Sequence, residues 1–355
     1  MDVDYIIIHK LKGTEDDREI LLEAGKILSN DGLVVFPTET VYGIGANALS
    51  PEAVKKIFVA KGRPSDNPLI VHISELNMLE LLASTISDIE NRLMTAFCPG
   101  PLTMILKKTD LVPNEVTGGT NSVAVRMPSS NIARQIISFA NKPIAAPSAN
   151  KSGKPSGTTV TDIFDELKDH VDMFLDAGNS DIGLESTVVK VNGDIPIILR
   201  PGKITPEDIK SVVGHVQIDE SVFTQCNDST PVLSPGMKYR HYAPNCECIL
   251  VEGISNELKV SKIHDIVKQS YSEKIVIICV NENIPMYKCF DNIVILPMGS
   301  CHDYSEISKN IFTLLRKAEG YLPKMVLIES LQKEGLGIAL MNRLVRACGY
   351  NIIHC

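Results

Sequence analysis

The sequence predicts a soluble protein built from two α/β domains. Its 355 residues exceed the roughly 100 to 200 residues that one domain usually holds. Hydrophobic residues make up 44% of the chain and charged residues 22%, which is typical of globular proteins and unlike disordered or fibrous ones. Short apolar runs also mix with helical patterns along most of the chain, and this mixture is typical of the α/β class.

Residues 1–215 are expected to form the first domain. In chain order, the patterns predict a strand in IIIHKL (6–11), a helix from about Asp16 to Asn30, a strand in LVVF (33–36), a helix from about Pro51 to Lys61 and a strand in LIVHI (69–73). Many connections in this half are rich in Gly, Pro and Ser, so we expect prominent loops there.

Residues 216–245 are expected to form a linker, because most of this segment is rich in Ser, Pro, Asn and Asp and lacks periodicity. The remaining residues, 246–355, alternate between the two patterns. Predicted strands lie in ECILVE (247–252), KIVIICV (274–280), NIVIL (292–296) and MVLIE (325–329), and predicted helices span 256–270, 303–320 and 335–348. Such alternation predicts a small, Rossmann-like parallel sheet with helices on its faces.

Charge and cysteine content exclude several classes of protein. The formal net charge of −8 argues against a protein that coats nucleic acid or anionic membrane, because such binding needs many Lys and Arg contacts. The N-terminal residues lack a signal-peptide pattern, and no apolar run approaches the roughly 20 residues of a membrane span. We therefore expect a cytoplasmic protein with no membrane association and no strong direct binding to nucleic acid.

The nine cysteines are expected to be reduced thiols, because their number is odd and they form no CxxC pair. Cys246 and Cys248 form a lone CxC motif. A packed strand is favoured there over half of a metal site, because no second ligand pair is present.

Most of the negative charge falls in residues 1–215, yet this half also holds clustered cations. Lys142, Lys151 and Lys154 lie in an acid-free segment, KPIAAPSANKSGKPSG, and LRPGK adds Arg200 and Lys203. These cations lie in loops rich in Gly, Ser and Pro, which favours a small polyanionic ligand over a broad nucleic-acid surface.

Six segments of the first half gather hydroxyls, amides and cations next to predicted strands. They are PTETVYGIGANA (37–48), KGRPSDNPLIVHI (61–73), CPGPLTMIL (98–106), SVAVRMP (122–128), APSANKSGKPSGTT (146–159) and LESTVVKV (184–191) with LRPG (199–202). Open α/β sheets bind ligands at strand ends, so these segments are expected to form a binding site. They contain no GxSxG motif and no Cys beside a recognisable base, which disfavours covalent catalysis.

Two common nucleotide motifs are absent. No segment has the spacing of the Walker pattern, so the chain is not a standard P-loop NTPase. The run GLGIA (335–339) lacks the third glycine of a dinucleotide fingerprint, and a turn at a helix start is favoured there.

The six segments, in this order, resemble the YrdC-type threonylcarbamoyl-AMP synthases. The runs KGR and SAN match the KxR and SxN signature of the family at Lys61, Arg63, Ser148 and Asn150. The linker SPGMKYRHYAP (234–244) and the α/β tail resemble the longer, two-domain members. The resemblance implies a YrdC-like twisted mixed sheet around a deep cavity, followed by the small parallel domain, to which no role is assigned.

The resemblance also implies the reaction. L-Threonine, bicarbonate or carbon dioxide, and ATP would give L-threonylcarbamoyl-AMP and pyrophosphate, which makes the protein a nucleotidyltransferase. The product would supply the threonylcarbamoyl group for modification of the tRNA adenosine next to the anticodon, which downstream tRNA threonylcarbamoyl transferase proteins would complete. Such chemistry needs positioning and charge neutralisation more than a protein nucleophile.

Residue roles follow from the same resemblance. Lys61 and Arg63 would be the catalytic cations, acting as a clamp on the triphosphate and the carbamate. The ATP contacts would be Arg63, Asn67, Ser122, Ser148, Asn150, Ser156, Arg200, His241 and Tyr242. The threonine pocket would consist of Thr40, His72, Arg126, Ala146 and Ser186. Mg²⁺ is expected to bind through the ATP phosphates, and no residue is assigned to it.

Several of these residues have a second interpretation. Lys61 and Arg63 could be a surface pair on a helix, although the adjoining loop disfavours this. Arg126 ends an apolar strand, where either a ligand carboxylate or an internal salt bridge would relieve the cost of burial, and the ligand is favoured. His72 alone would be a buried core histidine, and only the resemblance makes it a ligand contact. His241 and Tyr242 could close over the cavity as a lid or lie in a solvated linker.

Two departures from the family limit the transfer of roles. Cys98 stands where relatives often have an aromatic residue before PGPLT, and Lys190 follows ESTVV where an acid is common. Two other functional classes are also considered. An RNA-binding or translation-factor module is opposed by the net charge and by the lack of aromatic residues among the basic loops. A carbamoyl-transfer maturation enzyme is opposed by the absence of CxxC pairs.

Overall fold

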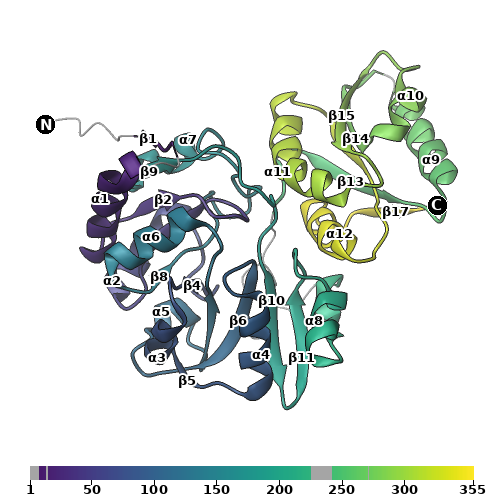
Figure 1. Cartoon of the computed structure of the whole chain (residues 1–355). Helices are drawn as coiled ribbons and strands as arrows, with labels where there is room; N and C mark the ends of the chain where they lie inside the picture. The colour runs from purple at the N-terminus through teal and green to yellow at the C-terminus, as the bar shows by residue number, and fades with distance from the viewer. Residues whose placement is uncertain (1–7, 13–14, 225–241, 271) are drawn as a thin grey trace, which may run out of the picture. The chain divides into compact units, whose positions relative to one another are not determined.

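The computed structural model describes residues 8–12, 15–224, 242–270 and 272–355 (Figure 1). These residues belong to two compact units. The first unit comprises the described parts of Met1–Ser152 and Ser156–Lys238, and the second comprises Gly153–Pro155 and the described parts of Tyr239–Cys355. Each unit has a sheet and a hydrophobic core of its own.

The first unit is built on a mixed sheet. In spatial order its strands are β1 (Ile8–Lys10), β9 (Met173–Asp176), β2 (Val34–Phe36), β3 (Gly43–Asn47), β8 (Ile144–Ala145), β4 (Ile70–His72), β7 (Ser122–Arg126), β6 (Leu102–Lys108), β10 (Thr187–Asn192), β11 (Ile195–Arg200) and β12 (Gln217–Ile218), while β5 (Ala83–Thr85) pairs with β6. Strand β4 runs parallel to β7 and antiparallel to β8, whereas β6 runs antiparallel to β7 and parallel to β10. The predicted mixed sheet is therefore confirmed.

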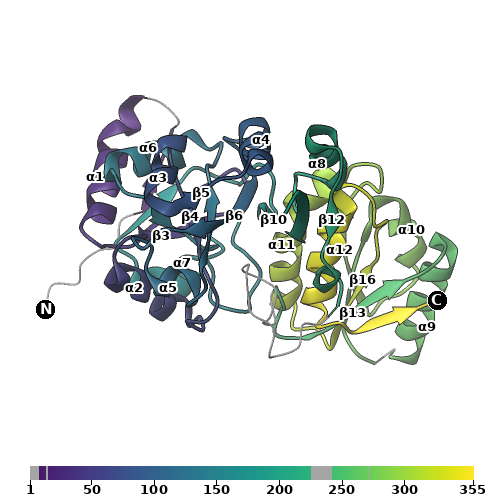
Figure 2. The same ribbon diagram turned by 90° about the horizontal axis from the view of Figure 1, so that it is seen from below.

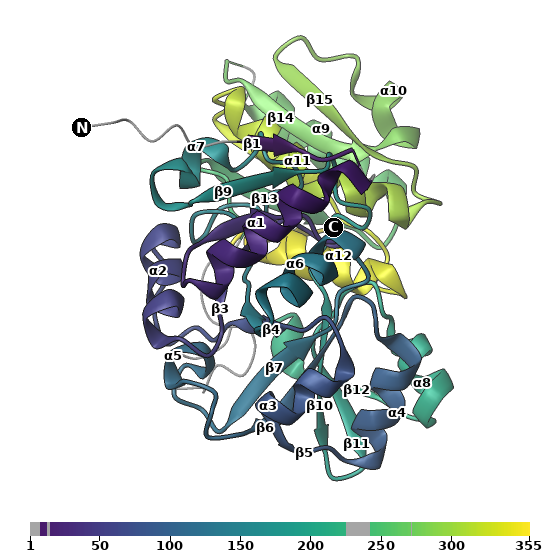
Figure 3. The same cartoon turned by 60° about the vertical axis from the view of Figure 1, so that its left-hand side comes forward.

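Helices pack against this sheet. They are α1 (Arg18–Ser29), α2 (Pro51–Lys61), α3 (Leu79–Leu82), α4 (Asp88–Phe97), α5 (Asn114–Thr117), α6 (Asn131–Ala140), α7 (Phe164–Leu167) and α8 (Pro206–Val213). Helices α1 and α6 lie side by side and share a core with β2 (Figure 3). Their close approach needs Gly25, because a Cβ atom there would lie only 2.6 Å from Cβ of Phe139.

Helix α2 ends where the KGR signature begins. Ser50 caps its first turn by accepting a hydrogen bond from the Ala53 amide, and Pro51 occupies the first helical position, where no backbone donor is needed. Gly62 adopts the left-handed conformation, with φ of 59°, and terminates the helix. Lys61 is therefore the last helical residue, and only 2% of it is exposed.

The second unit is a parallel sheet with helices on both faces. Its strands lie in the order β15 (Ile293–Gly299), β14 (Ile275–Val280), β16 (Met325–Glu329), β13 (Glu247–Glu252) and β17 (Ile352–His354), and neighbouring strands are parallel. Helices α9 (Asn256–Gln269) and α10 (Ile284–Tyr287) cover one face, and α11 (Tyr304–Gly320) and α12 (Leu336–Ala347) cover the other (Figure 2). The predicted parallel domain is confirmed, and α9, α11 and α12 agree with the predicted helices to within one residue at each end.

The cysteines of the described residues are free thiols, in agreement with the sequence analysis. Cys248 is buried within β13, as expected of a packed strand. Within the described ranges, no helix combines the length and apolar character needed to cross a bilayer. Gln217 and Ile218, which were expected to lie in the linker, instead form β12 and pair with β11. Most of the rest of the predicted linker lies outside the described residues.

Candidate active site

Polar side chains of the first unit meet at the point where strands β4 and β7 end and strands β6 and β10 begin. His72 and Arg126 are the last residues of the parallel strands β4 and β7, and they lie opposite each other in the register. Because β6 runs antiparallel to β7, Thr103 near its amino end also lies opposite Arg126. Ser186, directly before β10, places its hydroxyl 2.7 Å from the hydroxyl of Thr103. The mixed strand directions therefore bring distant segments of the sequence to one point.

Arg126 is buried at this point and is paired within the protein. Its Nη2 lies 2.7 Å from Oε1 of Glu39, and the two side chains are only 4% and 7% exposed. Nη1 donates to Oγ1 of Thr40 at 2.9 Å, and Nε donates to the Gly100 carbonyl at 3.4 Å. The internal salt bridge is thus present, although the sequence analysis favoured a ligand carboxylate. A guanidinium has five N–H groups, and counting the ion pair three of them face protein atoms. Among the described residues, Nη2 has no well-aligned hydrogen bond in spite of its short distance to Glu39.

The loop that carries Glu39 is ordered by hydroxyl groups. Burial would by itself raise the pKa of Glu39, but the charge and hydrogen bond of Arg126 outweigh this effect and hold the pKa below its ordinary value. The hydroxyl of Thr38 donates to the Val41 carbonyl at 2.6 Å and lies 2.8 Å from the hydroxyl of Thr40. The PTET segment therefore presents an ionised carboxylate and a fixed hydroxyl to Arg126.

His72 is buried beside this ion pair, with 3% of the residue exposed. Its Nδ1 lies 3.3 Å from the Ile70 carbonyl, which also accepts a hydrogen bond from the Ala146 amide at 2.9 Å. Burial and the charge of Arg126 lower the pKa of His72 to about 3. The imidazole is therefore neutral at pH 7, so it can form hydrogen bonds but carries no charge.

Arg200, the last residue of β11, orients Ser186. Its Nε donates to the Ser186 carbonyl at 3.1 Å, and its Nη2 donates to the Ser186 hydroxyl at 3.0 Å. Ser186 in turn contacts Thr103, which lies opposite Arg126. The residues predicted for the threonine pocket therefore all lie on or beside β4 and β7. Thr40 and Ser186 are connected to Arg126 directly or through Thr103, and Ala146 is hydrogen-bonded to Ile70 of β4.

Lys61 holds the SAN loop. Its Nζ donates to the Ser148 carbonyl at 2.5 Å and also to the Asn150 carbonyl. The Ser148 hydroxyl donates to Oδ1 of Asn150 at 2.6 Å, so the loop also has a contact of its own. Since Lys61 is buried, the alternative of a surface pair on a helix is excluded for it.

Arg63 and Asn67 lie in the loop that follows α2. Nε of Arg63 donates to the Asn67 carbonyl at 3.2 Å, and Nη2 donates to the Pro68 carbonyl at 2.9 Å. Asn67 is only 1% exposed, and within the described part of the chain neither its side-chain nitrogen nor its side-chain oxygen has a hydrogen-bond partner. An unpaired buried amide costs about 1–3 kcal/mol, which makes Asn67 a strong candidate for a ligand contact.

The candidate site is elongated along β4 and β7. Asn67 precedes β4 and Ser122 begins β7, whereas His72 and Arg126 end these strands. The span from Ser122 to Arg126 is roughly 13 Å at about 3.3 Å per residue. The predicted ATP contacts Asn67 and Ser122 therefore lie at the end of these strands opposite His72 and Arg126.

The remaining predicted ATP contacts are placed differently. Ser156 donates its hydroxyl to Oε1 of Glu185 at 2.5 Å, next to Ser186. His241 lies outside the described residues, so the lid hypothesis stays a prediction. Tyr242 belongs to the second unit, where it is buried and stacks on Phe312 with 5.0 Å between ring centroids.

Besides Thr38, three polar residues among the described part of this site were not predicted. They are Glu39, Thr103 and Glu185, which contact Arg126, Ser186 and Ser156 respectively. All three lie within the six segments, and Glu39 and Glu185 each precede a predicted residue. Their position next to predicted residues could have identified Glu39 and Glu185 from the sequence. Only the tertiary structure shows which partner each of the three residues contacts.

Replacing His72 by Asn should flatten the acid dependence of stability. As pH falls below the ordinary His pKa of 6.5, the unfolded chain binds a proton that folded His72 accepts only near pH 3, so stability is lost across this window. One such proton contributes up to about 1.4 kcal/mol per pH unit. Denaturant titrations between about pH 7 and pH 5 should show a shallower decline for His72→Asn than for the wild type. The exposed His170→Asn is the control, and equal declines for His72→Asn and the wild type would contradict the assignment.

Comparison with known protein families covers nearly the whole chain. Residues 26–202 match the family described as Telomere recombination, which combines Sua5, YciO and YrdC. Residues 204–349 match the family described as Threonylcarbamoyl-AMP synthase, C-terminal domain. The resemblance noted from the sequence is therefore confirmed in both halves.

Full-length relatives show the same correspondence. The threonylcarbamoyl-AMP synthase of Pyrococcus abyssi is 41% identical over 347 residues, covering 98% of this chain and 99% of the relative. That of Bacillus subtilis is 38% identical over 335 residues, covering 94% of each chain. The crystal structure of P. abyssi Sua5 complexed with L-threonine superposes with a TM-score of 0.90 at 39% identity and covers 99% of both chains. The chain therefore belongs to the Sua5/YrdC family of threonylcarbamoyl-AMP synthases, in its two-domain form.

Proposed function

We propose that this chain makes L-threonylcarbamoyl-AMP from L-threonine, bicarbonate or carbon dioxide, and ATP, with release of pyrophosphate. The observation that carries the proposal is the elongated site of the first unit. Buried cations lie there with a neutral histidine and with the amide of Asn67, which has no hydrogen-bond partner among the described residues. The relatives that match along the whole chain are named for this activity, and one of them was solved with L-threonine.

The reaction suits a site without a nucleophile. The threonine amine adds to carbon dioxide and loses a proton, which gives a carbamate. When bicarbonate is the source, the same carbamate forms with loss of water. A carbamate oxygen then attacks the α-phosphorus of ATP, and the bond between that phosphorus and the leaving pyrophosphate breaks. Every partner in these steps is anionic or becomes so, and fixed cations stabilise such charge.

The end of the site around Arg126 would hold threonine. The two remaining N–H donors of Arg126 would bind the substrate carboxylate, which would share the guanidinium with Glu39. The hydroxyls of Thr40 and Ser186 and the neutral imidazole of His72 would bind the other polar groups. Because His72 carries no charge at pH 7, it would not compete with Arg126 for the carboxylate.

The opposite end would hold ATP. Lys61 fixes the SAN loop through two backbone carbonyls and places a positive charge beside Ser148 and Asn150. Arg63 is oriented by the carbonyls of Asn67 and Pro68, so its planar fork is preorganised for phosphate oxygens. The free amide of Asn67 would then pair with the nucleotide.

Mg²⁺ is proposed to accompany ATP. The acids at the site, Glu39 and Glu185, already contact Arg126 and Ser156, so the described residues offer few carboxylates to a metal. This fits Mg²⁺, which usually binds one or two carboxylates together with substrate phosphates and water. When bound, Mg²⁺ would neutralise charge on the leaving pyrophosphate, and no metal ligand is assigned.

The product is proposed to serve tRNA modification through separate transferase proteins. A mixed anhydride of carbamate and phosphate is an activated donor that transfers the threonylcarbamoyl group to a nucleophile such as an adenosine amine. The RNA-binding alternative is less well supported, because the cations of this site are buried rather than spread over a surface. The maturation-enzyme alternative still lacks its zinc-binding CxxC pairs.

Pyrophosphate release by the purified chain tests the function directly. We expect release from ATP to require both threonine and bicarbonate, because the carbamate is the attacking group. Release should be measured with each substrate omitted in turn. Unchanged release without threonine would contradict the proposed reaction.

Arg63→Ala should lower turnover by roughly 100-fold or more, because a preorganised donor to the developing charge is lost. Arg63→Lys should restore little of the rate, because an ammonium lacks the planar fork. Lys55→Ala is the control, since Lys55 lies exposed on the adjacent helix α2. Near-normal kcat in Arg63→Ala would remove Arg63 from the clamp.

Asn67→Ala should weaken ATP binding without loss of stability. Among the described residues its side-chain amide has no hydrogen bond to lose on substitution, so the free energy of unfolding should stay level or rise, while KM for ATP rises by about tenfold. Asn47 is a contrasting buried asparagine, because its amide pairs with Asp31 and with the Leu49 backbone. Asn47→Ala should lose stability and keep its KM. A KM unchanged by Asn67→Ala would contradict the assignment.

A further inference from the structure

A cavity of about 490 Å³ belongs wholly to the second unit. Apart from Lys259 of α9, its lining comes from the carboxyl ends of four parallel strands and the segments that follow them, namely 252–256 at β13, 280–283 at β14, 301–304 at β15 and 330–333 at β16. Doubly wound parallel sheets bind their ligands at this edge. None of the residues assigned to the synthase reaction lines this cavity.

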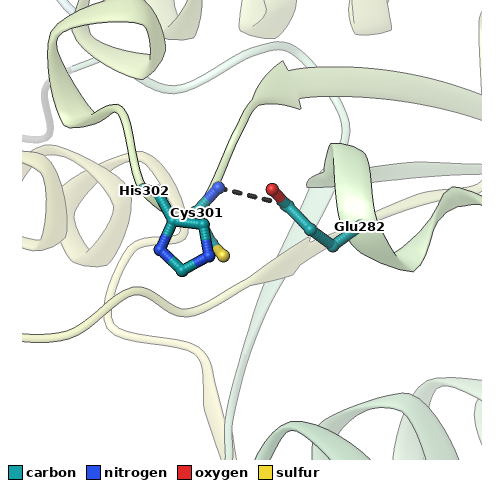
Figure 4. Close-up of side chains that lie close together, drawn as sticks. All are labelled: Glu282, Cys301 and His302. Atoms are coloured by element: carbon teal, nitrogen blue, oxygen red, sulfur yellow. Dashed lines mark hydrogen bonds between the residues drawn. The ribbon is translucent and has the colours of Figure 1, made fainter.

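Three residues of the cavity form a cluster of metal-ligand type, Glu282, Cys301 and His302 (Figure 4). A carboxylate oxygen, the thiol sulfur and an imidazole nitrogen all lie within 4.8 Å of one another. Glu282 follows β14 while Cys301 and His302 follow β15, and these two strands are parallel neighbours. The carboxylate of Glu282 faces the Cys301 segment and accepts a hydrogen bond from its amide at 3.0 Å (Figure 4).

We propose that Glu282, Cys301 and His302 bind one divalent transition-metal ion of the zinc type. A thiolate, an imidazole and a carboxylate together suit zinc, whereas Mg²⁺ and Ca²⁺ prefer oxygen ligands alone. Three protein ligands leave one position of a tetrahedron. Because all three residues line the cavity, that position opens into it, as in sites that bind a water or a small ligand.

The segment after β15 is held in place by hydrogen bonds around the cluster. The Ser300 amide donates to Oε2 of Glu306 at 2.9 Å, and the Ser300 hydroxyl donates to Oε1 of Glu282 at 2.6 Å. The His302 amide donates to the Ser300 hydroxyl oxygen at 3.2 Å, and Asp303 caps the start of α11. Such outer contacts orient metal ligands and reduce the ordering that binding requires.

The ligand atoms of the cluster are oriented before any ion binds. Both oxygens of the Glu282 carboxylate accept hydrogen bonds, one from the Ser300 hydroxyl and one from the Cys301 amide. A bound dication would stabilise the thiolate of Cys301 directly. Lys259 also lines the cavity, so an anion at the open coordination position would meet a second cation.

Cobalt(II) substitution of the full chain tests the site, because thiolate coordination gives a near-ultraviolet charge-transfer band that oxygen-bound cobalt lacks. We expect one equivalent of Co²⁺ to produce this band and Zn²⁺ to abolish it, while excess Mg²⁺ leaves it unchanged. Cys301→Ser should lose the band and His302→Ala should weaken binding by at least about tenfold. Cys289→Ser, at an exposed cysteine outside the cluster, should retain both.

The cobalt experiment has two results that would contradict a metal site at Glu282, Cys301 and His302. A wild-type chain without the band, or a Cys301→Ser chain that keeps it, would overturn the proposal. Far-ultraviolet circular dichroism and thermal unfolding of Cys301→Ser report independently that the second unit of the variant is folded. Failure of the proposed synthase activity in the wild type would leave the cobalt result unaffected, since none of the three ligands belongs to the synthase site.

Discussion

The buried ion pair between Arg126 and Glu39 is the interaction on which the site of the first unit depends. Both side chains are more than nine-tenths buried, and removing one partner of such a pair typically costs about 3–5 kcal/mol. The pair fixes the PTET segment against the end of β7 and brings Thr40 to the same guanidinium. The register of β4, β6 and β7 places His72 and Thr103 opposite Arg126, so the polar groups at this end of β4 and β7 gather around one buried charge.

Lys61 and Arg63, at the other end of the site, are positioned by backbone carbonyls rather than by a carboxylate such as Glu39. Lys61 donates to carbonyls of the SAN loop, and Arg63 donates to carbonyls of its own loop. The position of each cation therefore depends on the conformation of the loop whose carbonyls it contacts, and the loop conformation depends on the cation. Asn67, whose backbone carbonyl accepts a hydrogen bond from Arg63, has a buried side-chain amide without a hydrogen-bond partner among the described residues, which is unusual for a core position.

The cavity of the second unit is positioned by the parallel direction of its strands. Its strands are parallel, so their carboxyl ends share one edge, and the cavity with Glu282, Cys301 and His302 lies there. In the first unit, mixed strand directions let amino and carboxyl ends meet, and the site extends along β4 and β7. The first unit thus gathers cations and hydroxyls at its candidate site, whereas the cavity of the second unit gathers a carboxylate, a thiol and an imidazole.

The sequence by itself determined most of the local elements and the motifs that place the chain in its family. Apolar periodicity located α9, α11 and α12 to within one residue, Gly62 ended α2 at Lys61, and the KGR and SAN motifs identified the catalytic domain. The sequence did not reveal the short strands β12 and β17, the pairing of Arg126 with Glu39, the contact between Thr103 and Ser186, or the meeting of Glu282 with Cys301. Each of these depends on strand order and register, which are set by packing the whole sheet and not by neighbours along the chain. Only the tertiary structure could therefore decide which residues the predicted ones would meet.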